Sequence, residues 1–114
     1  MSERRTFTAR VAGVEYQIPT TMTVLRGAEK ASGASLIEAV AENKLGDVLQ
    51  GVIFAGLEAI GVKEIDGEPL TYEAVGDACD FAETTDNYIA FASAMSPETA
   101  RQSEKNARVE GSRK

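Results

Sequence analysis

Residues 6–21 read TFTARVAGVEYQIPTT, in which apolar and polar side chains alternate on both sides of Ala12-Gly13. Alternation with a period of two residues is typical of a strand with one buried face. Gly13 supplies the positive φ that a tight turn tends to require. Pro19 ends the second strand, because proline has no N–H to donate to a neighbouring strand. The stretch predicts an antiparallel β-hairpin, whose apolar face must pack on something because a lone hairpin is marginally stable in water.

After Pro19 the spacing of apolar residues changes to the helical period. We expect Thr23 to cap a short helix that Gly33 ends. Ser35 is expected to cap the next helix, with Glu38 as its capping-box partner. The change of period predicts an α+β fold that is mostly helical, with the N-terminal β-hairpin packed on a small helical bundle. The second of these helices has an apolar stripe made of Leu36, Ile37, Val40 and Ala41.

The strongest helical pattern follows Asp47, which we expect to be its N-cap, and closes at Gly61. Gly51 and Gly56 lie inside this helix, and each costs about 1 kcal/mol relative to alanine. A neighbouring backbone packed closely against them would offset that cost. The apolar stripe of this helix consists of Leu49, Val52, Ile53, Leu57 and Ile60.

The second half of the chain contains weaker signals. A turn around Asp66-Gly67 is compatible with a second, short hairpin. Thr71 is expected to cap a helix, and Thr84 or Thr85 is expected to start the next one. These segments complete the predicted helical bundle.

The composition changes at Pro97, where Ser96 and Pro97 fit the cap and the first position of a further helix. Residues 98–114 hold five basic and three acidic side chains, and Val109 is their only sizeable apolar residue. Such a segment cannot bury enough surface to fold alone. We therefore predict a flexible N-terminus at 1–5, a single globular domain at 6–96 and a charged tail, helical or disordered, at 97–114.

The net charge limits the range of partners. The 114 residues are 43% hydrophobic, which is enough for a core, and carry a formal net charge of −6. Nucleic-acid binding needs clustered cations, and anionic membranes repel an acidic surface. One cysteine allows no intramolecular disulfide, which favours a reducing, cytoplasmic setting. No apolar run approaches the roughly 20 residues of a membrane span.

The chain has little that could carry catalysis. It contains no histidine, so the commonest general base and metal ligand is missing, and no Ser-His or Cys-His nucleophile pair can form. Neither G-x-G-x-x-G nor G-x-x-x-x-G-K-[ST] occurs, so no phosphate-binding loop is recognisable. We expect a protein that is not an enzyme and needs no metal or other cofactor.

The lone cysteine and a run of carboxylates have simple structural interpretations. Asp77 and Asp80 flank Cys79 and would raise the pKa of its thiol, so we interpret Cys79 as a small core residue. Glu83 and Asp86 continue the acidic series at intervals of three residues. This spacing is that of one face of a helix rather than of a calcium loop. It indicates a solvated helix face, with a site for a cationic partner as the alternative.

Phe54 is the most informative residue of the helix that follows Asp47. At about 100° per residue it lies roughly 140° around the axis from Leu49, so the helix is apolar over more than one stripe. Either the helix is central and packed on two sides, or Phe54 belongs to a surface that binds a partner. Phe91 raises the same question on the next long helix. The candidate partner-binding residues are Phe54, Tyr88, Phe91 and Met95.

The first half of the chain resembles the small tail assembly chaperones of long-tailed phages and gene transfer agents. The resemblance lies in TFTARVAGVEYQIPTT, TVLRGAEKASG and ASLIEAVAENKLGDVLQGVIFAGLEAIGV. That family typically has a strand, a glycine turn and a tyrosine-containing strand. A glutamate-containing helix ending in Gly-x-Ser follows, and then an Ala/Leu-rich helix ending near Ala-Ile-Gly. The matching segments here are Gly13–Ile18, Glu29–Leu36 and Asp47–Gly61.

The resemblance implies a helix-rich fold and a role in coating the tape measure protein while the tail tube polymerises around it, in the cytoplasm of a bacterial host. It carries no catalytic residues. The segment from Leu70 to Met95 has no match, which leaves open a minor structural protein of the tail or head-tail joint. A cytosolic adaptor is a third alternative. The expected partner is a protein, either a tape measure or another tail protein, and homo-oligomerisation is left open.

We predict that removing residues 98–114 changes the free energy of unfolding by less than about 1 kcal/mol, because this segment has almost no apolar surface to bury. Thermal unfolding of the truncated chain and of the full chain measures the difference. Loss of cooperative unfolding on truncation would show that the tail packs on the rest of the protein.

Overall fold

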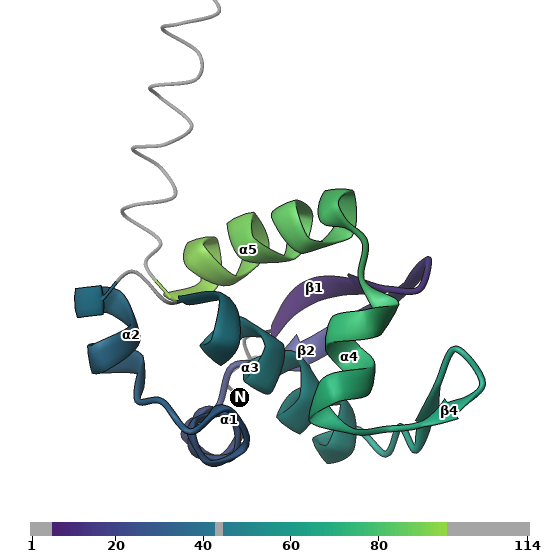
Figure 1. Cartoon of the computed structure of the whole chain (residues 1–114), viewed down its shortest axis with the longest axis horizontal. Helices are drawn as coiled ribbons and strands as arrows, with labels where there is room; N and C mark the ends of the chain where they lie inside the picture. Colours follow the sequence, from purple (N-terminus) through teal and green to yellow (C-terminus); the bar gives the residue numbers. More distant parts are fainter. Residues whose placement is uncertain (1–5, 43–44, 96–114) are drawn as a thin grey trace, which may run out of the picture.

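A two-stranded hairpin lies among helices in the structure, a computed structural model that describes residues 6–42 and 45–95 (Figure 1). The described part of the chain is mostly helical, which confirms the predicted α+β class. The Ser96-Pro97 helix start, the N-terminal residues 1–5 and the tail fall outside the described residues. The elements in chain order are β1 (Thr6–Val11), β2 (Val14–Pro19), α1 (Met22–Ser32), α2 (Leu36–Glu42), α3 (Leu45–Ala59), β3 (Glu64–Ile65), β4 (Glu68–Pro69), α4 (Tyr72–Ala78) and α5 (Phe81–Met95).

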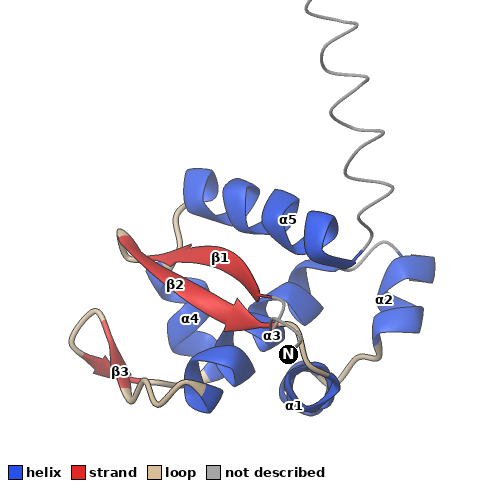
Figure 2. Ribbon diagram, turned by 180° about the vertical axis from the view of Figure 1, so that it is seen from behind, coloured by secondary structure: helices blue, strands red, loops and turns tan. Residues whose placement is uncertain are grey.

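The predicted N-terminal hairpin is confirmed. β1 and β2 pair antiparallel, with Phe7 opposite Ile18. Ala12 and Gly13 form the turn with φ angles of 52° and 80°, the pair of positive values that matches the twist of the two strands. Both Phe7 and Ile18 are buried on the inner face of the hairpin. Figure 2 shows α5 running beside β1 on one side of the hairpin, while α3 lies behind β2.

The first helix begins earlier than the sequence predicts. Thr21, not Thr23, is the N-cap of α1, and its hydroxyl accepts a hydrogen bond from the Val24 N–H at 3.3 Å. Thr21 is the last residue with an extended backbone after β2, so its side chain can fold back over the first turn, whereas Thr23 already lies inside the helix. Gly33 ends α1 at a φ of 75°, as predicted.

Two side chains cap the start of α2. The Ser35 hydroxyl accepts a hydrogen bond from the Glu38 N–H at 3.1 Å, which confirms the predicted cap. The Glu29 carboxylate of α1 also accepts one from the Leu36 N–H at 2.9 Å. Because free N–H groups at a helix start attract negative charge, Glu29 stabilises the start of α2 and links it to α1.

The long helix α3 is the centre of the fold. It packs most extensively against α1 and also contacts β2, α2, α4 and α5. It starts at Leu45, so Asp47 lies in its first turn and is not the N-cap that the sequence predicts. A carboxylate there still favours the helix start, since it faces the positive end of the helix dipole. Gly61 ends the segment with a φ of 87°, as predicted, but Ile60 is 44% exposed and does not belong to the buried stripe.

Gly51 in α3 meets a neighbouring backbone, as the sequence predicts, whereas Gly56 meets a side chain. A Cβ atom on Gly51 would stand 2.6 Å from the backbone oxygen of Ala28 in α1. A Cβ atom on Gly56 would overlap the side chain of Ile18 in β2. Hydrogen in place of a side chain therefore lets α3 approach a helix on one side and the hairpin on the other.

The second half of the chain follows the predicted order of elements. Asp66 and Gly67 form the turn of the short hairpin between β3 and β4, and the Thr71 hydroxyl accepts a hydrogen bond from the Ala74 N–H at 3.0 Å to cap α4. The last helix, however, starts at Phe81 rather than at Thr84 or Thr85.

The reason for this early start is a capping box at the beginning of α5. The Asp80 carboxylate accepts a hydrogen bond from the Glu83 N–H at 2.7 Å, and the Glu83 carboxylate accepts one from the Asp80 N–H at 3.4 Å. The series from Asp77 to Asp86 is thus not one face of a single helix: Asp77 belongs to α4, Asp80 is the cap, and Glu83 and Asp86 lie in α5.

We predict that Gly51→Ala destabilises the protein by about 1–3 kcal/mol, because the backbone of Ala28 cannot move aside for the new methyl group. Gly46→Ala is the matched control in the same helix, since a Cβ there meets nothing within 4 Å. The control should be neutral or stabilise by up to about 1 kcal/mol through helix propensity. Chemical denaturation of both variants measures these changes, and equal effects would disprove the close contact.

Candidate functional site

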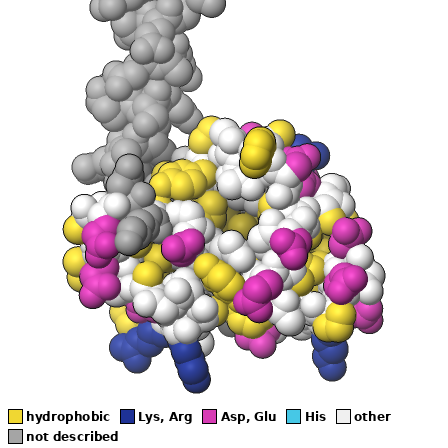
Figure 3. Space-filling view, viewed as in Figure 1, with side chains coloured by type: hydrophobic (Ala, Val, Ile, Leu, Met, Phe, Trp, Pro, Cys, Tyr) yellow, Lys and Arg dark blue, Asp and Glu magenta, His cyan; other side chains and the backbone are white. Residues whose placement is uncertain are grey.

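An apolar groove opens between the starts of α1 and α2 and the C-terminal half of α5, over the open end of the hairpin. Its volume is about 260 Å³. Phe7, Val24, Val52 and Phe91 are buried residues at its base, and Met22, Leu25, Leu36 and Ala94 are among the more accessible residues that line it. Figure 3 shows hydrophobic side chains in the hollow beneath α5. We call this feature the apolar groove.

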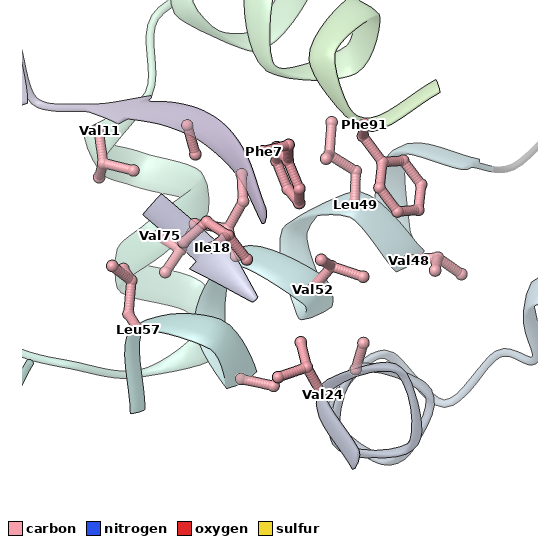
Figure 4. Packing of buried hydrophobic residues seen from close by; sticks show 14 of the residues in the cluster. Phe7, Val11, Ile18, Val24, Val48, Leu49, Val52, Leu57, Val75 and Phe91 are labelled. Carbon is pink, nitrogen blue, oxygen red and sulfur yellow. The ribbon is translucent and has the colours of Figure 1, made fainter. Parts of the chain in front are cut away.

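The base of the groove depends on an aromatic pair that joins β1 to α5. The rings of Phe7 in β1 and Phe91 in α5 lie 5.8 Å apart between centroids and are tilted by 53°. Figure 4 shows the two rings side by side, with Val52 of α3 below them. A tilted aromatic pair stabilises a core by more free energy than the burial of its apolar area alone contributes. The pair holds α5 against the hairpin and so fixes one wall of the groove.

The candidate partner-binding residues differ in how deeply they are buried. Phe91 is only 5% exposed, so the structure favours the core alternative for it. Phe54 and Tyr88 are half-buried and pack against the core. Met95 is the last residue of α5, and its side chain lies outside the described part. Of the three candidates whose side chains are described, Phe91 alone lines the groove. Helical spacing on α5 could not show that Phe7 packs on Phe91.

The most exposed apolar helix face beside the groove is on α2, and sequence reasoning assigned it to the bundle. Ile37 is 83% exposed and Val40 is 57% exposed, whereas Ala39 is buried against α3. Ile37 and Val40 of the apolar stripe predicted for this helix therefore face outward, whereas Leu36 is partly buried and packs against the core. Met22, at the start of α1, adds a further exposed apolar side chain at 69%. In the sequence this exposed face is visible only as an apolar stripe on a two-turn helix. The stripe does not show whether the face points toward the core or toward solvent.

A polar cluster closes the other end of the hairpin. Asn87 of α5 is 1% exposed. Its side-chain oxygen accepts a hydrogen bond from the Arg10 N–H at 2.7 Å, and its nitrogen donates one to the Arg10 carbonyl at 2.9 Å. The carboxamide thus pairs with the edge of β1 as a third strand would. Asn87 thus satisfies the backbone N–H and carbonyl of Arg10 at the partly buried edge of β1, which is a structural role.

Cys79 lies next to this cluster and is not activated. Its thiol donates to the Arg10 carbonyl at 3.6 Å. Partial burial, followed by the charges of Glu83 and Asp80, raises the pKa of the Cys79 thiol to about 11. The thiol therefore stays protonated near neutral pH, opposite to the state that a nucleophile needs.

The described surface is strongly acidic. Residues 6–42 and 45–95 contain 14 Asp or Glu and four Lys or Arg, a net charge of −10. Arg10 and Asp86 form an ion pair at 4.0 Å with both side chains largely exposed, which contributes little stability. Within the described ranges no group of three or more metal-ligating side chains is placed to hold an ion.

Comparison with known proteins gave no matching family model, no matching curated protein and no matching solved structure. In the part of the chain that the structure describes, no helix has both the length and the apolar character to cross a membrane.

We predict that Phe91→Ala lowers the free energy of unfolding by about 3–5 kcal/mol, the usual cost for a buried aromatic. Phe81→Ala is the control on the same helix, because Phe81 is 94% exposed, and it should change stability by less than about 0.5 kcal/mol. Equilibrium unfolding of the two variants tests this. A Phe91→Ala protein as stable as its control would mean that Phe91 is not part of the core.

Proposed function

We propose that this chain is a tail assembly chaperone of a long-tailed phage or phage-like particle, acting in the host bacterial cytoplasm. It binds the tape measure protein during assembly of the tail tube and does so through the apolar groove and the adjoining face of α2. The proposal rests on the resemblance in the first half of the chain. The observation that carries it is the groove itself, flanked by apolar side chains that the rest of the chain leaves exposed.

The size and chemistry of the groove suit anchor side chains of a helix. A volume of about 260 Å³ accepts one or two large apolar side chains, while pockets for whole small ligands usually measure about 300–1,000 Å³ and add several polar groups. None of the described residues that line the groove carries a titratable side chain. An amphipathic helix docks by inserting such anchors at helical spacing into an apolar groove. Binding, not catalysis, is the role that this site supports.

The residues that carry the resemblance have structural roles that build this site. Gly13 makes the hairpin turn, Glu29 caps α2, and Gly33 ends α1. Gly51 lets α1 pack closely on α3. They lie in or next to β1, α1 and α2, and these three elements supply part of the groove lining. The residues that carry the resemblance thus support the fold around the groove, which is what links the resemblance to the proposed site.

The experiment is co-expression of the chain with the product of the long, coiled, tape-measure-like reading frame that we expect directly downstream of its gene. The chain should keep this client in the soluble fraction and should be absent from purified particles. Its presence in mature particles would instead favour a minor structural protein of the tail or head-tail joint.

Two double variants assign the effect to a surface. Met22→Gln with Ile37→Gln removes apolar side chains beside the groove, and we expect it to weaken client binding by at least about tenfold, as loss of anchor residues does. Phe81→Gln with Ile89→Gln removes two exposed apolar side chains that do not line the groove, so binding should persist. Both variants should unfold like the unmodified chain. Equal client binding by both would contradict the proposed site.

A further inference from the structure

The exposed apolar side chains beside the groove have charges of both signs next to them. On α1, Arg26 and Lys30 follow Met22 at intervals of four residues, so the three side chains lie along one face of the helix. On α2, Glu38 follows Ile37 and lies in the first turn. Figure 3 shows basic side chains projecting below α1 and acidic side chains over α2, on adjoining parts of the surface. This surface therefore combines apolar side chains with basic groups on one helix and acidic groups on the next.

The charges on these two helices are available to a partner. Arg26, Lys30 and Glu38 are exposed, and within the part of the chain that the structure describes they form no ion pair. Glu42, the other acidic residue of α2, already takes part in an interaction and is not needed for the pairing described below.

A surface with this arrangement is complementary to itself. In a symmetric dimer both copies use the same surface, so a contact from residue i to residue j of the partner is repeated from j to i. A two-fold axis can thus place α1 of each copy against α2 of the other. Both contacts then set Arg26 opposite Glu38 of the partner subunit and cover apolar side chains of the two helices. Repulsion between two described surfaces of net charge −10 is screened beyond about 8 Å at physiological ionic strength.

We infer that the free chain forms a two-fold dimer through the exposed faces of α1 and α2, and that this dimer hides the client-binding surface until a client replaces the second copy. Met22, Ile37 and Val40 would otherwise remain in water next to one another, which is unfavourable for a chain without its client. A client also inserts anchors into the groove, so it binds more tightly than the second copy and displaces it. The inference rests on the proposed function and adds a regulation of the same site.

Charge reversal on the two helices tests this arrangement. Arg26→Glu places like charges opposite each other at both contacts of its own dimer, and so does Glu38→Lys. Each variant alone should self-associate at least about tenfold more weakly than the unmodified chain. An equal mixture of the two variants has opposite charges at both contacts again, so it should form a heterodimer about as readily as the unmodified chain dimerises. Sedimentation velocity at physiological ionic strength, over a range of chain concentrations, measures all three.

Two matched variants control for net charge. Lys63→Glu and Glu64→Lys make the same changes of charge at exposed positions outside α1 and α2, and self-association should stay within about twofold of that of the unmodified chain. Circular dichroism verifies that every variant is folded. A mixture of folded Arg26→Glu and Glu38→Lys chains that stays monomeric would overturn the inference. Equal weakening by the control variants would also overturn it, because only the overall charge would then matter.

The tape-measure-like product separates the inference from the proposed function. When it is added, dimers of the chain should convert into complexes that contain one copy of the chain at each binding site. A chain that is monomeric at every concentration but keeps this client soluble would overturn the inference and leave the proposed function intact. Client bound to an intact dimer would overturn the inference as well, because the two surfaces would then be distinct. A dimer that accepts no client would overturn the proposed function and the regulation built on it, but not the self-association.

Discussion

The close approach of α3 to α1 is the contact on which the rest of the structure depends. Gly51 faces the backbone of Ala28 at a distance that leaves no room for a side chain. Gly56 faces the side chain of Ile18 in the hairpin, again with no room for a Cβ atom. α3 therefore lies between a helix and a hairpin and packs closely on both. The two glycines destabilise the helix taken alone, and the packing that they permit offsets this. Every wall of the groove is positioned relative to this centre.

Helices hold the hairpin on both of its sides. β2 packs on α3, and β1 is sealed by α5, where Asn87 occupies the hydrogen-bonding groups of Arg10. A two-stranded sheet with an open edge would invite pairing with other strands. With β1 fixed in this way, Phe7 and Phe91 form a stable base for the groove.

The described lining of the groove is mainly apolar. The lone thiol, Cys79, is kept protonated by burial and by neighbouring carboxylates, and the described groove lining is without titratable groups. Apolar surface is instead exposed on α2, where Ile37 and Val40 extend the groove outward. Such surface beside a groove is typical of a protein that binds another protein.

The sequence by itself determined the features that depend on neighbouring residues. The Gly13 turn, the left-handed ends at Gly33 and Gly61 and the Thr71 cap follow from local backbone and hydrogen-bonding preferences. Even so, the sequence predicts the starts of α1, α3 and α5 too late. The N-cap is the last residue with an extended backbone, and several nearby side chains could act as the cap. In α1 the N-cap is Thr21.

Only the tertiary structure decided which apolar residues are covered. Periodicity shows that a helix has an apolar face, but not whether that face points inward. Phe91 is buried because Phe7, 84 positions earlier in the chain, packs on it, whereas Ile37 is exposed because the Glu29 cap and the contacts of Ala39 turn α2 with this side outward. Burial depends on contacts between distant segments, and a local pattern carries no information about them.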